Sequence, residues 1–346
     1  KLSHINDMRI ERSLENFAYG FSCSCIPSSV DFEAGDKVEV FWDEKQLGQG
    51  KDAIFCGYID SLSVQLSGSS SSTTFSARSY ALDLIDSVDS LAGIEGELAD
   101  VVEKVCKSYS IPFSNTTKGK LGWVRFACEN ESPFRILHDL ARAKGAMLVT
   151  NGWGALELAR VKSDVLSGTL RLRDMVEVAY QSDISQCYHK YHGVIAGAEY
   201  QETDARVRKS RVLQLAADGE SIGLLRSQLK NEKGRRYGLS QKLRLTVASW
   251  RAASSSTHWY ENSNVWVEVP ELGISKRKFF VYGVTLTLSK YNGYRAELLC
   301  CNREAFDLKA SGSSASGGTA SGGTQRAAFV TMSGVEKARQ RRNEVQ

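Results

Sequence analysis

The sequence predicts an α+β fold in which two β-barrel-like domains flank a smaller helix and hairpin domain. Three observations support this. Apolar and polar residues alternate with a period of two along several segments of the first ninety residues, which is typical of half-buried strands. The apolar spacing becomes helical between residues 97 and 145, and alternating segments then return up to residue 301. A chain of 346 residues is long enough for two or three such domains.

Residues 1–90 are expected to form the first β-barrel-like domain. Its main feature is a hairpin, in which Val64 and Leu66 alternate with polar residues before a Ser/Gly tip, and Phe75 and Ala77 alternate after it. A Gly-Tyr-Ile-Asp sequence before the hairpin is expected to turn the chain. Further strands are predicted at residues 18–25 and 38–42, and short strands at such spacing are typical of a small barrel or sandwich.

Residues 91–168 are expected to form the helix and hairpin domain. Ser132 and Pro133 predict a helix start with a side-chain N-cap, and Gly145 predicts its end in a left-handed cap. Asn151-Gly152 lies between two short alternating segments and predicts a hairpin over residues 146–159. An earlier helix is marked by apolar residues at helical spacing: Leu98, Val101, Val102, Val105 and Tyr109.

Residues 169–310 are expected to form the second β-barrel-like domain. Residues 170–181 are interpreted as the end of a connection, with the β-rich part opening at Cys187. An inserted helix is predicted at about 218–236, with Ile222, Leu225 and Leu229 on one side. The strands of this part are predicted at residues 243–250, 265–269, 279–289 and 294–301.

The last part of the chain has a different composition. Residues 311–324 consist mainly of Gly and Ser and are expected to be a flexible tether. Residues 325–346 form a basic C-terminal tail with five basic and two acidic residues. This tail is too short to be a stable helix by itself.

Composition and charge exclude several classes of protein. Hydrophobic residues make up 42% and charged residues 24% of the chain, an ordinary globular composition, and no apolar run approaches the roughly 20 residues that cross a membrane. The net charge is +4, of which the tail contributes +3, so the remainder is nearly neutral. A protein that grips nucleic acid by its phosphates normally carries a concentrated basic surface, which these totals do not indicate.

The cysteines are expected to be buried free thiols in a reducing compartment. Their spacing includes no repeated C-x2-C pair, and Cys23 and Cys25 would share one face of a strand instead of bracketing a metal. No signal peptide is visible in the sequence, which begins at Lys1. The eight cysteines are Cys23, Cys25, Cys56, Cys106, Cys128, Cys187, Cys300 and Cys301.

The sequence contains few groups of residues that could bind a metal or a cofactor. Cys187, His189 and His192 are the most compact set of potential ligands, but strand alternation would place His192 on the opposite face from the other two. We therefore expect no metal site. We also expect no cofactor, because no phosphate-binding loop or Gly-x-Gly-x-x-Gly sequence follows a predicted strand.

A catalytic centre is not expected either. Ser67-Gly68 and Ser311-Gly312 lack the strand-turn-helix context that exposes a nucleophilic serine. Asp83 and Asp86 could serve as an acid and a base, but their spacing beside Leu84 is more typical of a helix start or a solvated turn. The chain is thus predicted not to be an enzyme.

The order of these segments resembles a known family. The Gly-Tyr-Ile-Asp turn at residues 57–60, the polar-tipped hairpin and the Ala-Leu-Asp-Leu-Ile-Asp sequence at 81–86 resemble the baseplate hub proteins of Mu-like contractile phages and prophages (43 kDa tail proteins). The helix, glycine and hairpin succession at residues 132–159 follows in the same order. The resemblance extends from about Ile5 to Leu308, and more distantly the pattern is similar to the ring portion of type VI secretion spike proteins.

The resemblance implies a function as well as a fold. It implies a homotrimeric ring at the centre of the baseplate, in which two similar β-domains per subunit adapt a sixfold tail tube to a threefold spike. The implied partners are the tail tube protein and the spike protein, and DNA would pass through the lumen without specific binding. The implied location is the tail of the virion, after assembly in the cytoplasm of the host bacterium.

An alternative remains open at this point. A glycan-binding or hydrolytic tail module could use a similar β-scaffold. A glycan-binding face would require several aromatic side chains on one exposed surface, whereas isolated aromatic residues in strands usually pack in a core. The candidate residues are Trp42, Trp123, Trp153, Trp250, Trp259 and Trp266.

Overall fold

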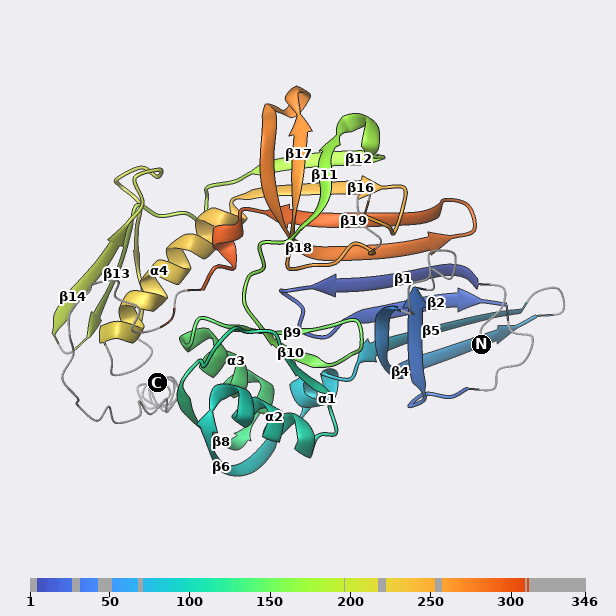
Figure 1. Cartoon of the computed structure of the whole chain (residues 1–346), viewed down its shortest axis with the longest axis horizontal. Coiled ribbons are helices and arrows are strands. Elements are labelled where there is room, and N and C mark those ends of the chain that lie inside the picture. The colour runs from blue at the N-terminus through green and yellow to red at the C-terminus, as the bar shows by residue number, and fades with distance from the viewer. Residues whose placement is uncertain are drawn as a thin grey trace, which may run out of the picture.

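The computed structural model describes residues 5–26, 32–42, 52–67, 71–195, 197–216, 222–252, 257–308 and 310. One long sheet crosses the molecule, a helix-containing domain lies below it in Figure 1, and a long helix lies against a small sheet at the left. The 311–324 tether and the 325–346 tail lie outside the described residues. No helix in the described part is long and apolar enough to cross a lipid bilayer.

The long sheet contains strands from both ends of the chain. Its hydrogen-bonded order is β12-β16-β19-β18-β1-β2-β5-β4-β3, with β17 paired to β18 and β11 paired to β17. The strands are β1 Ile5–Ser13, β2 Gly20–Cys25, β3 Lys37–Trp42, β4 Asp52–Leu66, β5 Ser71–Ser79, β11 Val165–Arg171, β12 Glu177–Ser182, β16 Gln241–Val247, β17 Ser263–Val269, β18 Ile274–Ser289 and β19 Gly293–Cys301.

This sheet contains the same arrangement twice. We call β1 to β5 the first β-unit, and β12 with β16 to β19 the second β-unit. Taken in chain order, the five strands of each unit are arranged first, second, fifth, fourth, third across the sheet. The fourth strand is the longest in both units, with 15 residues in β4 and 16 in β18. The predicted fold class is confirmed, and in addition β1 pairs with β18 to join the two β-units into one sheet.

The two faces of the sheet differ in chemistry because side chains alternate along each strand. One face packs a single core that contains residues of both β-units, including Ile10 and Phe75 of the first and Leu245 and Val284 of the second. The opposite face carries mainly polar side chains. A single row of aligned positions on that face crosses both units: Arg295, Thr287, Arg9, Ser22, Ser76 and Ser61.

The Gly-Tyr-Ile-Asp sequence does not form the predicted corner. It lies inside the continuous strand β4, where the pairing with β5 shifts register between Ile59 and Ser61. An extra residue in one strand is a β-bulge, which bends the strand without ending it. The same kind of shift occurs between Val281 and Gly283 of β18 opposite β19, so the bulge is part of the repeated arrangement.

The helix and hairpin domain has its own core, which is formed by its helices and its strands. The two main predicted helices are confirmed, whereas strands β6 and β8, which pair with each other, were not predicted. The hairpin of β9 and β10 is confirmed. The elements are α1 Leu82–Asp86, β6 Asp89–Glu97, α2 Leu98–Ser108, β7 Phe113–Asn115, β8 Trp123–Glu131, α3 Pro133–Ala143, β9 Met147–Thr150 and β10 Leu156–Ala159.

The two ends of α3 differ in how well the sequence predicts them. Gly145 has φ of 69°, which confirms the left-handed cap. The predicted N-cap bond of Ser132 is wrong, because its hydroxyl donates to the Ile85 carbonyl, 3.0 Å away. Ser132 therefore ties α3 to the end of α1 instead of capping its own helix.

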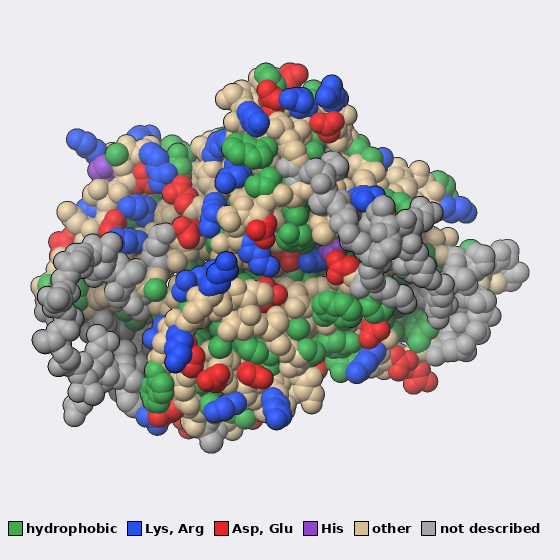
Figure 2. All heavy atoms as spheres, viewed as in Figure 1, with side chains coloured by type: hydrophobic (Ala, Val, Ile, Leu, Met, Phe, Trp, Pro, Cys, Tyr) green, Lys and Arg blue, Asp and Glu red, His purple; other side chains and the backbone are tan. Residues whose placement is uncertain are grey.

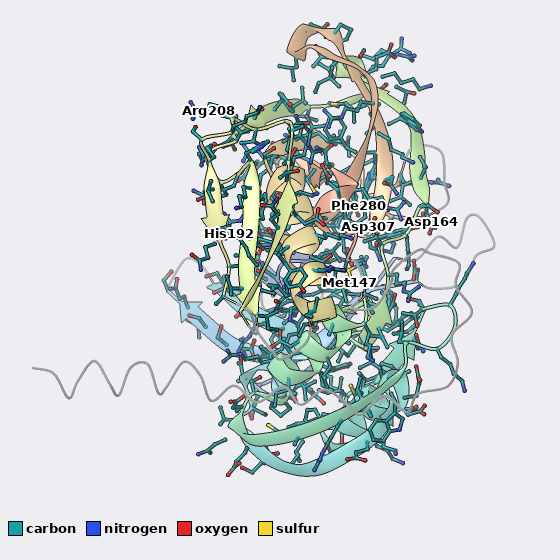
Figure 3. The ribbon with its side chains drawn as sticks, turned by 90° about the vertical axis from the view of Figure 1, so that its left-hand side faces the viewer. Met147, Asp164, His192, Arg208, Phe280 and Asp307 are labelled. Carbon is teal, nitrogen blue, oxygen red and sulfur yellow. The ribbon has the colours of Figure 1, made fainter. Side chains whose placement is uncertain are left out.

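The β9 to β10 turn rests directly on the first β-unit. A Cβ atom at Gly152 would lie 2.0 Å from the Ala53 carbonyl oxygen of β4, so only glycine allows this close approach. Met147 of β9 and Phe280 of β18 belong to one further core between this domain and the second β-unit (Figure 3). The domain is thus packed against both β-units.

The inserted helix α4 Ile222–Leu239 covers a separate small sheet and not the long one (Figure 1). Leu225 and Leu229 pack there as predicted, whereas Ile222 is exposed, which corrects its predicted place on the buried side. The small sheet contains β13 Lys190–Ile195, β14 Ala198–Thr203 and β15 Val212–Gln214. Short 3-10 helices are η2 Leu172–Asp174, η3 Pro270–Leu272 and η4 Arg303–Ala305.

Residues 170–181 are not a connection. They include the end of β11 and nearly all of β12, the outermost strand of the long sheet. The prediction failed there although Val176, Val178 and Tyr180 alternate with polar or small residues. The second β-unit therefore begins before Cys187, and the three strands that directly follow Cys187, β13 to β15, belong to the small sheet.

Candidate assembly surface

The polar face of the long sheet is slightly hollowed. A groove runs along it across the boundary between the two β-units, and its polar lining consists chiefly of small hydroxyl side chains. Ser61 and Ser76 hydrogen-bond to each other across β4 and β5 with their oxygens 2.8 Å apart. Arg9 is paired with Glu11 on the same strand. The polar lining residues are Asp7, Arg9, Ser22, Ser24, Ser61, Ser63, Thr74, Ser76, Thr287, Ser289, Asn292 and Arg295.

The strand edges of the long sheet without a partner strand in the described residues include one side of β12 and the second half of β4. β12 pairs with β16 along one side, and no described strand pairs with its other side. β3 and the turn before it cover β4 as far as Ile59, and β5 is the one described strand that pairs with the rest of β4. Unpaired strand edges are templates for pairing with another chain.

Both edges carry exposed apolar side chains. Val64 and Leu66 on β4 are 42% and 76% exposed. Val176 and Ile184, which flank β12, are 48% and 43% exposed. Exposed apolar residues on open strand edges mark a surface for association.

A buried polar network lies where the two β-units and the helix and hairpin domain meet. Arg12 of β1 donates to both carboxylate oxygens of Glu261, at 3.0 and 3.3 Å. Arg12 also lies 2.9 Å from Nε2 of His258, whose Nδ1 is 3.2 Å from Asp52 of β4. Tyr19 contacts Glu261 through its hydroxyl, which also reaches the carbonyl of Thr150 in β9.

The charges in this network are set by burial and by each other. Burial alone opposes a charged Arg12, but the attraction of Glu261 and Tyr19 outweighs it and raises the pKa of Arg12. Burial lowers the pKa of His258, and the neighbouring Arg12 lowers it further against the opposing effect of Asp52. Because arginine only donates hydrogen bonds, Nε2 of His258 must accept, which leaves the proton of the neutral ring on Nδ1. The network is a structural joint whose residues no local sequence pattern predicts.

The candidate metal ligands do not come together. Cys187 is buried and lies 3.5 Å from the carbonyl of Arg236. His189 Nδ1 lies 2.8 Å from the carbonyl of Asp204, and His192 lies beside Glu199 on the small sheet (Figure 3). No group of three His, Cys, Asp or Glu side chains in the described part of the chain has a geometry that could hold a metal ion.

Of the candidate catalytic residues, Asp83, Asp86 and Ser67 lie in the described part of the chain. Asp83 and Asp86 are exposed on the short helix α1, and Asp86 forms an ion pair with Arg78 at 3.3 Å. Ser67 follows the end of β4, and Gly68, Ser311 and Gly312 lie outside the described residues. Asp83 lies in the first turn of α1, in line with the expected helix start.

The five tryptophans whose side chains the structure describes do not form one exposed face. Trp250 and Trp259 are buried in the core shared by the β-units. Trp123 and Trp153 are exposed, on β8 and on the β9 to β10 turn, and Trp266 lies under Lys276 and Lys278 on β17 and β18. The side chain of Trp42 lies outside the described set. Figure 2 shows hydrophobic side chains gathered near the β9 to β10 turn, where Phe41 packs against Trp153 with ring centroids 5.9 Å apart.

The eight cysteines are free and buried, as predicted. Burial raises the pKa of the Cys23 thiol to about 12 and that of Cys56 to about 11. The reactive thiolate form is therefore scarce at neutral pH.

Comparisons with known proteins confirm the predicted resemblance. The chain is 22% identical over 324 residues to the baseplate hub protein gp44 of Escherichia phage Mu, and the match covers 86% of this chain and 84% of gp44. No protein-family model matches the sequence.

Solved structures of tail proteins share the fold. The 43 kDa tail protein of prophage MuSo2 from Shewanella oneidensis has a TM-score of 0.78 at 19% identity, with 88% of this chain and 96% of that chain covered. The tail protein of Neisseria meningitidis MC58 has a TM-score of 0.74 at 19% identity, covering 88% and 94%. The Escherichia coli type VI secretion component c3393 has a TM-score of 0.57 at 10% identity, covering 88% and 76%.

Proposed function

We propose that this chain is a structural baseplate hub of a contractile phage or prophage tail. Three copies form a ring that adapts the sixfold tail tube to the threefold spike and surrounds the passage for DNA. The observation that carries this proposal is the repeated β-unit within a chain similar to the hub gp44. Three subunits with two equivalent β-units each present six equivalent units around one axis, which is the match that such an adaptor needs.

The polar face of the long sheet is the proposed wall of the DNA passage. Its side chains are mainly hydroxyls, and Figure 2 shows basic and acidic side chains interspersed over the molecular surface in that view. DNA is held through phosphate contacts to clustered Lys and Arg, so a wall without such a cluster lets DNA slide. The proposed role requires no catalytic turnover, in keeping with relatives that are named as tail and hub proteins.

The parts of the chain receive different proposed roles. Residues 1–90 and 169–310 supply the ring, and residues 91–168 form a domain that braces both β-units. The tether and the tail after residue 310 are proposed to reach the spike or a neighbouring protein. The partners are the tube protein and the spike protein, the location is the virion tail, and assembly occurs in the host cytoplasm.

The experiment that tests this function is absolute mass by light scattering coupled to size-exclusion chromatography, over a dilution series. A species of three times the chain mass of 38.2 kDa is expected. The chain should also be purified with candidate tube and spike proteins added, because a partner can be needed to close the ring. A monomer under all of these conditions would contradict the proposal.

A further inference from the structure

The pairing of β1 with β18 joins the two β-units within one chain, and it provides a template for strand pairing between two chains. β18 is long enough to pair with two different strands along the same edge. Its first half pairs with β17, and residues 283–289 pair with β1 of the first β-unit. β4 is the equivalent of β18, and its first half pairs with β3 in the same way. In the described part of the chain, no strand pairs with the second half of β4 in the place that corresponds to β1.

The equivalence can be fixed residue by residue from the sheet register. Gly35 donates its amide to the Ile59 carbonyl at 2.8 Å just before the bulge of β4, and Asn262 donates to the Val281 carbonyl at 2.9 Å just before the bulge of β18. Ile59 therefore corresponds to Val281. Leu62 follows Ile59 by the same number of residues as Val284 follows Val281, so these two residues are equivalent. Each of them belongs to a row of positions that are paired across neighbouring strands. The two rows are Leu62, Phe75, Cys23 and Met8 in the first β-unit, and Val284, Leu298, Leu245 and Val178 in the second.

These rows show that β12 is the equivalent of β1, with Val178 in the place of Met8. β1 uses its outer side to pair with β18, and the corresponding side of β12 is the open edge of the long sheet. The chain thus carries both halves of a second joint, the open edge of β12 and the open second half of β4. They cannot meet within one chain, because six strands lie between them in the sheet.

We propose that β12 of one subunit pairs antiparallel with the second half of β4 in the next subunit, in the register that β1 and β18 adopt. Met8 lies opposite Leu288 and Ile10 opposite Leu286. The same register places Val178 opposite Leu66 and Tyr180 opposite Val64 of the neighbouring copy. On the polar face it places Ala179 opposite Gln65, as Arg9 lies opposite Thr287.

The side chains at the two open edges favour this pairing between two copies of the chain. Leu286 and Val284 are fully buried in the joint within the chain, whereas their equivalents Val64 and Leu62 lie at an open edge. Pairing with β12 would cover Val64 and Leu66 and continue the apolar core from one subunit to the next. The two edges are different surfaces, so the contact is head-to-tail and can close into a ring. This inference rests on the proposed function and adds the surfaces and register of its assembly.

Cysteine cross-linking of the full chain tests the register. Directly opposed residues of antiparallel strands have Cα atoms about 4.5 or 5.5 Å apart, within the range of a disulfide. Gln65→Cys combined with Ala179→Cys should give covalent trimers on a non-reducing gel after mild oxidation. The matched control is Ser61→Cys with Ala179→Cys, which uses the same face of the same strand but a position about 13 Å away. It should remain monomeric on the gel.

The outcomes separate this inference from the proposed function. A trimer in light scattering that cross-links through Gln65→Cys and not through Ser61→Cys supports both. A trimer that cross-links through the control pair, or through neither pair, overturns the register and leaves the hub function standing. Cross-linked chains larger than a trimer would support the strand pairing but overturn the closed ring. A chain that stays monomeric with tube and spike proteins present overturns both.

Discussion

Arg12 and Glu261 form a buried ion pair between residues 249 positions apart in the chain. Arg12 lies on β1 and Glu261 lies just before β17, so the pair joins the first β-unit to the second. Both side chains are less than a tenth exposed, and the guanidinium reaches both carboxylate oxygens. Two-point contacts of this kind fix orientation as well as distance. The pair therefore adds a fixed side-chain contact to the β1 and β18 strand pairing that joins the two β-units.

The replacement Arg12→Met should destabilise the fold strongly. It leaves the Glu261 carboxylate buried without its cation, and breaking one side of a buried pair typically costs about 3–5 kcal/mol. Urea unfolding followed by fluorescence measures the change. The double variant Arg12→Met with Glu261→Leu should recover much of the loss, since it leaves neither charge alone. Equal instability of the single and double variants would argue against this account.

Stability should fall as the pH decreases below neutrality because of His258. The unfolded histidine binds its proton from about pH 6.5 downward, whereas burial and Arg12 lower the pKa in the native state. Between these two pKa values the unfolded state holds more protons, so the free energy of unfolding rises with pH in that window. Thermal unfolding between pH 7 and pH 5 should show this slope.

Two variants test this assignment of the pH dependence. His258→Gln keeps an acceptor for Arg12 but cannot titrate, and should flatten the dependence between pH 7 and pH 5. His192→Gln changes a histidine on the small sheet, outside the network, and should keep the wild-type slope. If the slope survived in His258→Gln, another group would have to be responsible.

Gly152→Ala should loosen the helix and hairpin domain from the first β-unit. The added Cβ would lie 2.0 Å from the Ala53 carbonyl oxygen, so the turn or β4 must move. Overpacking of this kind typically costs about 1–3 kcal/mol, which would lower the urea midpoint. Gly168→Ala is the matched control, because a Cβ there meets no atom within 4 Å and the change should be small. A neutral Gly152→Ala would show that the turn is free to lift from β4.

Local patterns in the sequence predicted most of the strands and helices, and they failed where structure depends on distant partners. The hairpin of β4 and β5 and the helices α2 and α3 follow from periodicity and from Gly145. The bulge at Asp60 could not be distinguished from a corner, because a bulge is defined by its partner strand. Arg12 and Glu261 look like ordinary surface residues in sequence, since nothing local places them together.

The internal repeat was also invisible in the sequence. What the two β-units share is strand order, bulge position and hydrogen-bond register, and equivalent residues such as Met8 and Val178 share only apolar character. The strand β12 has only six residues, and its alternation of apolar and polar side chains is too short to distinguish a strand from the end of a connection. The resemblance to hub proteins predicted similar β-domains, but only the register shows which edges correspond.

The assembled protein should not bind double-stranded DNA at about 0.15 M salt, where screening leaves only clustered charges effective. Ser22→Lys with Ser76→Lys would place two cations per subunit on the polar face. This variant should acquire DNA binding that weakens steeply with salt. A fluorescence anisotropy titration with a labelled duplex measures both. Tight, salt-sensitive binding by the wild-type ring would contradict a freely sliding passage.

Val64→Glu should abolish trimer formation without unfolding the subunit. Val64 is 42% exposed on the open edge of β4, and a surface substitution typically changes stability by less than about 0.5 kcal/mol. In the proposed joint, however, this side chain meets Tyr180 and enters an apolar core, where an unpaired carboxylate is strongly disfavoured. Val194→Glu is the matched control, a valine 47% exposed on β13 and remote from both open edges. Light scattering should report a monomer for Val64→Glu and the wild-type mass for Val194→Glu, and the Val64→Glu monomer should still unfold cooperatively in urea. A Val64→Glu trimer would mean that subunits join through a surface other than this edge.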